Sequence, residues 1–279
     1  SSENVFGDIE QGIFLYRYLG NETEVKIPEE IDGLPVIRMS GVCFDQNERL
    51  KKVTLPKSMI WVDGFSNCVN LTDVVMEDGV RVIGCDAFEN CTSLEKIDLP
   101  DSVGFIGGFE LDCSAFSGCT SLKEIRLPKN LERMDNYAFS GCSALEKVEF
   151  PEKLHYIAVG CFAGCSALKR IELPNNFTYI ESEAFLACTS LEEVVLPSEL
   201  GAIDADAFYG CASLKEITIP AKVESLGNPW LYQDGYTFGG CTSLEKVTIL
   251  GKVKKIDQHL FENCTSLKEV MLPDSVTEI

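Results

Sequence analysis

Residues 139–165 read FSGCSALEKVEFPEKLHYIAVGCFAGC, and the two ends of this stretch repeat each other. Phe139 and Cys142 recur 23 residues later as Phe162 and Cys165. The phenylalanine is present in ten successive repeats: Phe44, Phe65, Phe88, Phe116, Phe139, Phe162, Phe185, Phe208, Phe238 and Phe261. The cysteine is present in nine, after Asn47 in the first: Cys68, Cys91, Cys119, Cys142, Cys165, Cys188, Cys211, Cys241 and Cys264. A repeat of this length indicates a stack of similar coils.

A short strand is predicted after each cysteine. In the segment Leu122-Lys123-Glu124-Ile125-Arg126-Leu127-Pro128, apolar and polar residues alternate, which is typical of a strand with one buried face. Proline then ends the strand because it cannot donate to a ladder. One coil buries too little apolar surface to offset the entropy of ordering it, so the coils must stack and their strands must pair in parallel. The sequence therefore predicts a solenoid with little regular α-helix.

The outward positions of these strands form three columns. The first two carry mixed charges, and we expect them to be solvated ion-pair ladders rather than a ligand site, because stacked like charges would repel at strand spacing. The third column is less regular. Its polar members are therefore candidate binding residues: Asp98, Arg126, Glu149 and Glu172.

Two coils carry insertions, because the cysteine interval rises to 28 residues before Cys119 and to 30 before Cys241. Aromatic residues lie in or beside both insertions: Phe105, Phe109, Trp230, Tyr232 and Tyr236. Insertions in solenoids form loops, and aromatic anchors on loops often bind partners. Two interpretations stay open: these side chains contact a ligand, or they fold back over the side of the solenoid.

The thirteen cysteines allow a disulfide ladder or a column of free thiols. Equivalent residues of adjacent coils are about 5 Å apart, within reach of a disulfide. In a regular column, however, each cysteine would have two equivalent partners, so free thiols packed as small apolar groups are the favoured interpretation. Cys161 and Cys165 lie near His155 but lack a second ligand pair, so no metal site is predicted.

Net charge and residue spacing exclude several functions. The chain has 24 basic and 44 acidic side chains and a net charge of −20, which disfavours nucleic acid as a partner. No apolar run approaches the roughly eighteen residues of a membrane span. The only two histidines, His155 and His259, are several coils apart, and no phosphate loop or nucleophile elbow is present. We predict neither an enzyme nor a cofactor.

The repeat resembles that of the bacterial BspA-like leucine-rich repeat family. Its pattern is Leu-x-x-Ile-x-Leu-Pro, a short apolar pair, then Ala-Phe-x-x-Cys-x-x-Leu, as in residues 145–188. The resemblance implies a right-handed, curved solenoid with a parallel sheet on one face and irregular, turn or short helical or strand segments on the other. It also implies a secreted or cell-surface protein that binds a protein or glycan ligand, often in adhesion. The alternative is a passive spacer within a larger surface protein.

The two ends of the chain complete the prediction. Alternation over residues 13–19, followed by the turn Gly20-Asn21, predicts an N-terminal β-hairpin cap within residues 1–26. Residues 27–279 are then a solenoid of about ten to eleven coils. Ile279 ends in mid-coil, so we expect the natural chain to continue, or the protein to associate with itself end to end or side by side.

Overall fold

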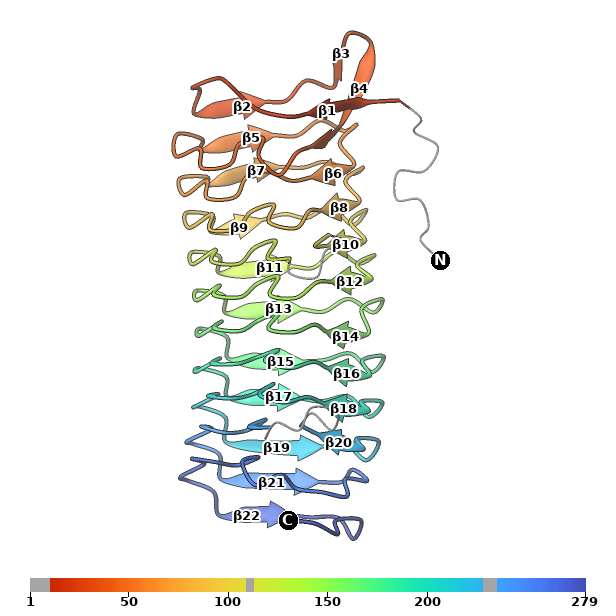
Figure 1. Ribbon diagram of the computed structural model, residues 1–279, viewed down its shortest axis with the longest axis vertical. Coiled ribbons are helices and arrows are strands. Elements are labelled where there is room, and N and C mark those ends of the chain that lie inside the picture. The colour runs from red at the N-terminus through yellow and green to blue at the C-terminus, as the bar shows by residue number, and fades with distance from the viewer. Residues whose placement is uncertain (1–10, 109–112, 228–234) are drawn as a thin grey trace.

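The structure is a computed structural model that describes residues 11–108, 113–227 and 235–279. These residues form a parallel β-solenoid of about 11 turns, and none of them lies in a helix (Figure 1). Most turns contribute two short strands that lie on two faces of the stack. The predicted solenoid of stacked coils is confirmed.

The first row of strands follows the cysteine turns and forms the front face of the solenoid. Where these strands pair, they pair in parallel and in register, for example Glu124 with Lys96 on one side and Lys147 on the other. The strands of this row are β2 (Glu24–Lys26), β5 (Lys52–Thr54), β7 (Asp73–Val75), β9 (Lys96–Ile97), β11 (Glu124–Arg126), β13 (Lys147–Glu149), β15 (Arg170–Glu172), β17 (Glu193–Val195), β19 (Glu216–Ile219), β21 (Lys246–Ile249) and β22 (Glu269–Met271).

The second row of strands comes after the proline turns and forms the back face. Its pairs are also parallel, in the orders β1-β4-β6-β8-β10-β12 and β14-β16-β18-β20. The strands are β1 (Ile13–Leu15), β4 (Leu34–Met39), β6 (Trp61–Val62), β8 (Val82–Ile83), β10 (Phe105–Ile106), β12 (Arg133–Met134), β14 (Tyr156–Ile157), β16 (Tyr179–Ile180), β18 (Ala202–Ile203) and β20 (Ser225–Leu226). The strand β3 (Glu30–Ile31) pairs with β4.

The repeated phenylalanines stack in one row through the core. Ring centroids are 5.1 Å apart between Phe116 and Phe139, 5.5 Å between Phe139 and Phe162, and 5.9 Å between Phe238 and Phe261. Tyr18 lies 4.8 Å from the first ring, Phe44, and so covers the N-terminal end of the row. Each coil therefore completes the apolar contacts of its neighbours.

The residue before each cysteine position adopts a left-handed backbone. Its φ is 55° at Asn90, 72° at Gly118 and 57° at Ala187. Such a conformation is costly for most L-residues but is accessible to glycine and asparagine. This explains why those two residue types dominate that position of the repeat.

The expected hairpin within residues 1–26 is wrong in its pairing, because the two strands of that segment do not pair with each other. Instead, β1 pairs in parallel with β4 and β2 pairs in parallel with β5. The observed hairpin is β3–β4, around Asp32 and Gly33, whose φ values are 52° and 79°. Two consecutive positive φ values fit the tight turn that a two-residue hairpin requires. The alternating pattern indicated strands, whereas stacking on the next coil determined their partners.

Candidate interaction surface

The front face presents the three predicted columns of outward side chains from β5 to β22. Eleven of the 24 basic and twelve of the 44 acidic side chains of the chain stand in these columns. The remaining thirteen basic and thirty-two acidic side chains lie elsewhere. The columns therefore carry −1 of the net charge of −20, and the rest of the chain carries −19.

Over β9, β11 and β13 the charges form a grid of three rows and three columns in which neighbours alternate in sign. The row at β9 reads negative, positive, negative; the row at β11 has the opposite signs; and the row at β13 repeats the first. The nine residues are Glu95, Lys96 and Asp98; Lys123, Glu124 and Arg126; and Glu146, Lys147 and Glu149. We call this set the charge grid.

Some charges of the grid are paired within the chain. Lys123 Nζ lies 2.8 Å from Glu95 Oε2, and Lys147 pairs with Glu149. These hydrogen-bonded contacts lower the pKa of both glutamates below its usual value. The predicted ion-pair ladder continues beyond the grid, where Lys268 Nζ lies 2.8 Å from Glu245 Oε2. All these side chains are exposed, so each pair contributes little to stability.

Four members of the grid form no ion pair within 4.0 Å among the residues that the structure describes. They are Lys96, Asp98, Glu124 and Glu146. Glu124 is in register with a lysine on each side, yet neither ammonium group lies within that distance. These four charges are available to an outside partner.

Two grooves cross the charge grid. The larger has a volume of about 630 Å³ and includes Thr72, Ser93 and Glu146 in its lining. The smaller has a volume of about 270 Å³ and includes Asp98, Arg126 and Glu149. Both are lined by Lys96, Glu124 and Lys147. This part of the front face therefore combines two hollows with mixed charge.

The structure brings three of the four third-column candidates together. Asp98, Arg126 and Glu149 line one groove, whereas Glu172 lies on β15 and bonds to Arg170 at 3.0 Å. Arg126 does not pair with its column neighbours; its guanidinium lies 2.7 Å from Asp101 Oδ1. That contact lowers the pKa of Asp101 and directs Arg126 toward the proline turn. Sequence reasoning missed Lys96, Glu124 and Lys147. The available signal was that, over these three coils, the second column has the opposite sign to the first in every row.

Of the candidate aromatic residues, the two that the structure describes, Phe105 and Tyr236, do not line either groove. Phe105 is half-buried on β10 of the back face, in register with Val82 and Arg133. Tyr236 is half-buried, with its ring stacked 4.6 Å from His259. Of the two interpretations, Tyr236 fits the one in which the side chain packs on the side of the solenoid. Phe109, Trp230 and Tyr232 lie outside the described residues.

The core cysteines form the predicted column of free thiols. Each one donates its S–H to the carbonyl oxygen of a phenylalanine in the preceding coil, as from Cys165 to Phe139 at 3.3 Å. Burial raises the pKa of Cys188 to about 12, so this thiol stays protonated at neutral pH. A weak donor of small volume fits this position, which has an acceptor but little space.

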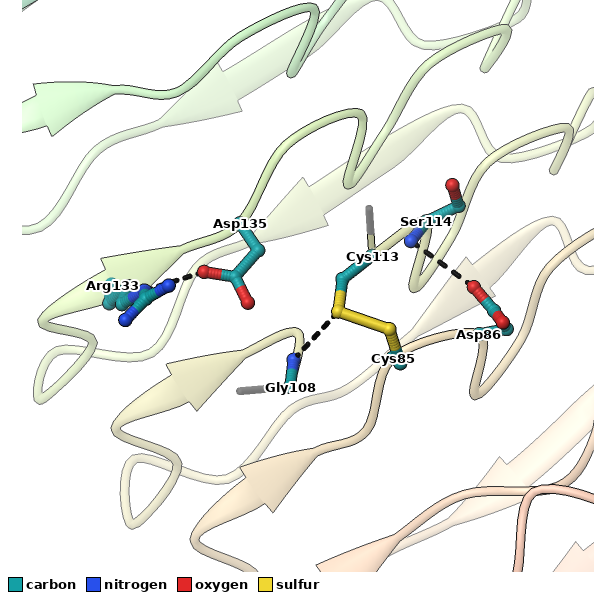
Figure 2. The surroundings of a disulfide bond; sticks show 7 residues. All are labelled: Cys85, Asp86, Gly108, Cys113, Ser114, Arg133 and Asp135. Atoms are coloured by element: carbon teal, nitrogen blue, oxygen red, sulfur yellow. Dashed lines mark hydrogen bonds and ion pairs between the residues drawn. A yellow bond between two sulfur atoms is a disulfide. The ribbon is translucent and has the colours of Figure 1, made fainter. Parts of the chain in front are cut away.

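Outside that column, Cys85 and Cys113 form a disulfide across adjacent coils (Figure 2). The bond flanks the five-residue insertion, and the Gly108 N–H donates to Cys113 Sγ at 3.2 Å. Among the described residues, no group of three or more histidine, cysteine, aspartate or glutamate side chains is arranged to hold a metal ion. Nor does any helix among them have the length and apolar character of a membrane span.

Stacked parallel strands with an inner row of leucine, isoleucine and phenylalanine define this chain as a leucine-rich repeat solenoid. The family model for the BspA type leucine rich repeat region matches residues 8–109, 109–234 and 232–279. The chain therefore belongs to the BspA-type leucine-rich repeat family. Proteins of this bacterial family are generally interaction or surface modules.

Solved structures agree with this assignment. A leucine-rich repeat protein from Bacteroides ovatus is 27% identical, with a TM-score of 0.75 over 95% of this chain and 73% of that one. A leucine-rich repeat protein from T. pallidum is 30% identical, with a TM-score of 0.58 over 73% of this chain and 83% of that one. A comparison with curated proteins found no match.

Proposed function

We propose that this protein is a non-enzymatic interaction module that binds a protein or glycan ligand through its front face. The observation that carries the proposal is the distribution of charge. The front-face columns carry −1 of the net charge while the rest of the chain carries −19. A partner of either sign can approach the front face without strong repulsion, whereas an acidic partner is repelled elsewhere.

The grooves over the charge grid support the same surface. They lie beside side chains with both donors and acceptors, and four of those charges have no ion-pair partner among the described residues. Protein and glycan ligands both present hydrogen-bonding groups that such a surface can match. The aromatic residues of the two insertions, Trp230 among them, are further candidate contact residues by their sequence alone.

A binding screen tests this proposal. Wild-type protein, immobilised at low density, is presented with host matrix proteins and a glycan array, and each ligand found is measured again with Arg126→Glu and Trp230→Ala. We expect Arg126→Glu to weaken binding at least about tenfold, because it reverses a charge in the smaller groove. Arg170→Glu on β15 is the matched control, since it reverses an exposed front-face arginine outside both grooves. Binding unchanged in Arg126→Glu would refute the front face as the site.

We further propose that the protein acts outside the cell or at the cell surface. Support comes from membership of the BspA-type family and from the Cys85–Cys113 disulfide, since disulfides persist mainly in oxidising compartments. Fractionation of the native organism followed by immunodetection tests this location. Protein found only in the cytosolic fraction would refute it.

A passive spacer is the second candidate function. A rigid stack of many coils that has no ligand-binding site would hold another domain at a distance from the cell envelope. The regular ladder beyond the charge grid, with pairs such as Lys268–Glu245, favours this function because it serves only stacking. A screen that returned no ligand for the wild-type protein would support the spacer over the binding module.

A further inference from the structure

Stacking does not require the charges of the grid to alternate along the strands as well as from coil to coil. Stacking favours opposite signs between neighbouring coils within one column, but it leaves the columns independent of one another. The next coil shows this freedom, because Lys169 and Arg170 stand side by side with the same sign. Over β9, β11 and β13, in contrast, all three columns alternate, and in every row the middle column has the opposite sign to the other two. A surface whose charges alternate both along the strands and from coil to coil can also match the charges of a docking partner.

Two neighbouring rows of this grid, β9 and β11, are complementary to each other. A two-fold axis that lies in the front face, parallel to the strands and midway between β9 and β11, places β9 of one copy opposite β11 of the other, and β7 opposite β13. Every column keeps its own position under this rotation, so each of the six charges of β9 and β11 meets a charge of the opposite sign. Farther out, β5 faces β15, where Lys51 and Lys52 stand opposite Lys169 and Arg170, so the favourable contacts are confined to the four central rows. An interface of this kind is isologous, with the same patch used by both molecules.

We propose that the charge grid docks on the charge grid of a second copy of this chain, face to face and antiparallel, with β9 of each copy opposite β11 of the other. This inference rests on the proposed use of the front face for binding and names its partner. The rotation predicts three reciprocal contacts, and it adds Lys147 with Asp73 of the second copy. In each reciprocal contact, a β9 residue of one copy faces a β11 residue of the other. The pairs are Glu95 with Lys123, Lys96 with Glu124, and Asp98 with Arg126.

Three further observations favour a second copy. Lys96, Glu124 and Asp98 have no ion-pair partner within 4.0 Å among the described residues, so docking supplies contacts that the single chain lacks. The front-face columns are nearly neutral, so two molecules of net charge −20 approach each other with least repulsion there. The grooves of about 630 and 270 Å³ provide space for the long side chains of the opposite copy.

Charge reversal with mixing tests the proposal. Sedimentation equilibrium at 0.15 M NaCl should show the wild-type mass rising from 30.8 kDa toward twice that value as concentration approaches about 1 mM, because exposed ion pairs make weak contacts. Lys96→Glu and Glu124→Lys should each weaken self-association at least about tenfold, since each places like charges opposite one another. An equimolar mixture of the two variants should restore dimers, and so should the double variant.

A matched control separates docking from local ladder effects. Glu216 and Lys246 are in register on β19 and β21, in the same column but outside the charge grid, so reversal of either should leave self-association unchanged. Circular dichroism should show every variant folded. A wild-type protein that stays at 30.8 kDa throughout, or variants whose mixture stays monomeric, would overturn the inference. In either case, a heterologous ligand with Arg126-sensitive binding would leave the proposed function standing.

Discussion

The disulfide between Cys85 and Cys113 allows a sharp test of how much a crosslink between two adjacent coils contributes to stability. The two residues are separated by 28 positions, and they connect successive coils on either side of residues 109–112. Replacing both with alanine removes a crosslink that restricts the unfolded chain. For a loop of this length the loop-closure entropy corresponds to about 3.5 kcal/mol at 25 °C. We therefore expect Cys85→Ala/Cys113→Ala to lower the free energy of unfolding by about this amount.

Urea denaturation with and without dithiothreitol measures the effect. The other eleven cysteines are free, so a reducing agent has one bond to break in the wild-type protein and none in the double variant. Reduction should therefore destabilise the wild type and leave the variant unchanged. A reductant effect of equal size in both proteins would refute the assignment of stability to this bond.

Thiol titration checks the covalent state independently. Urea-denatured protein without reductant should expose eleven titratable thiols, and thirteen after reduction. The folded protein should react slowly, because ten of the eleven free cysteines are buried and the remaining one, Cys264, is only partly exposed. Thirteen thiols in unreduced, denatured protein would show that the two cysteines are not joined.

Two further substitutions test the core and the buried charge. Phe162→Ala should cost about 3–5 kcal/mol in urea denaturation, because the buried ring stacks 5.5 Å from Phe139 and 5.7 Å from Phe185; a cost below about 1 kcal/mol would contradict a continuous row. Asp135→Asn should stabilise the fold at pH 7. Burial raises the pKa of Asp135 above its ordinary 3.8, and the nearby Arg133 offsets only part of that rise. The aspartate's contribution to stability therefore falls as pH rises from 3.8 through the raised pKa. The gain should vanish below pH 3.8, and a gain that grew on acidification would contradict this sign.

The repeat predicted the interior well because identical coils make identical contacts. Phe139 and Phe162 had to stack once their coils paired in register, and the same reasoning placed Cys142 and Cys165 in one column. The N-terminal segment was predicted less well. Its alternation identified strands, but an alternating strand can pair with any free edge. Here β1 pairs with β4 because the next coil offers that edge.

The disulfide shows a signal that was present in the sequence but was not used. Cys85 and Cys113 occupy equivalent positions of adjacent coils, once the five-residue insertion is allowed for. In a long column each cysteine has two equivalent partners, which disfavours a disulfide ladder. Cys85 and Cys113 are an isolated pair, so each has a single partner and the bond can form.

The charge grid was partly predicted. Its columns followed from the repeat, and the ion-pair ladder was expected. The partner of Arg126 was not, because Asp101 lies past the proline turn, where the alternating pattern no longer relates sequence position to direction. The grooves depend on side-chain conformations that spacing alone does not give.

Stacking imposes opposite requirements on the two sides of each strand. Inside, identical residues are favourable, since equal phenylalanines and leucines fill equal spaces and leave no cavity. Outside, identical charges are unfavourable, since neighbours at strand spacing repel. A sequence that met only these requirements would repeat its buried residues strictly and alternate its exposed charges strictly. Such a sequence would carry no information about a partner. Information about binding must therefore lie where the chain departs from both rules or exceeds them: at the two insertions, and over β9, β11 and β13, where alternation extends along the strands as well as across them.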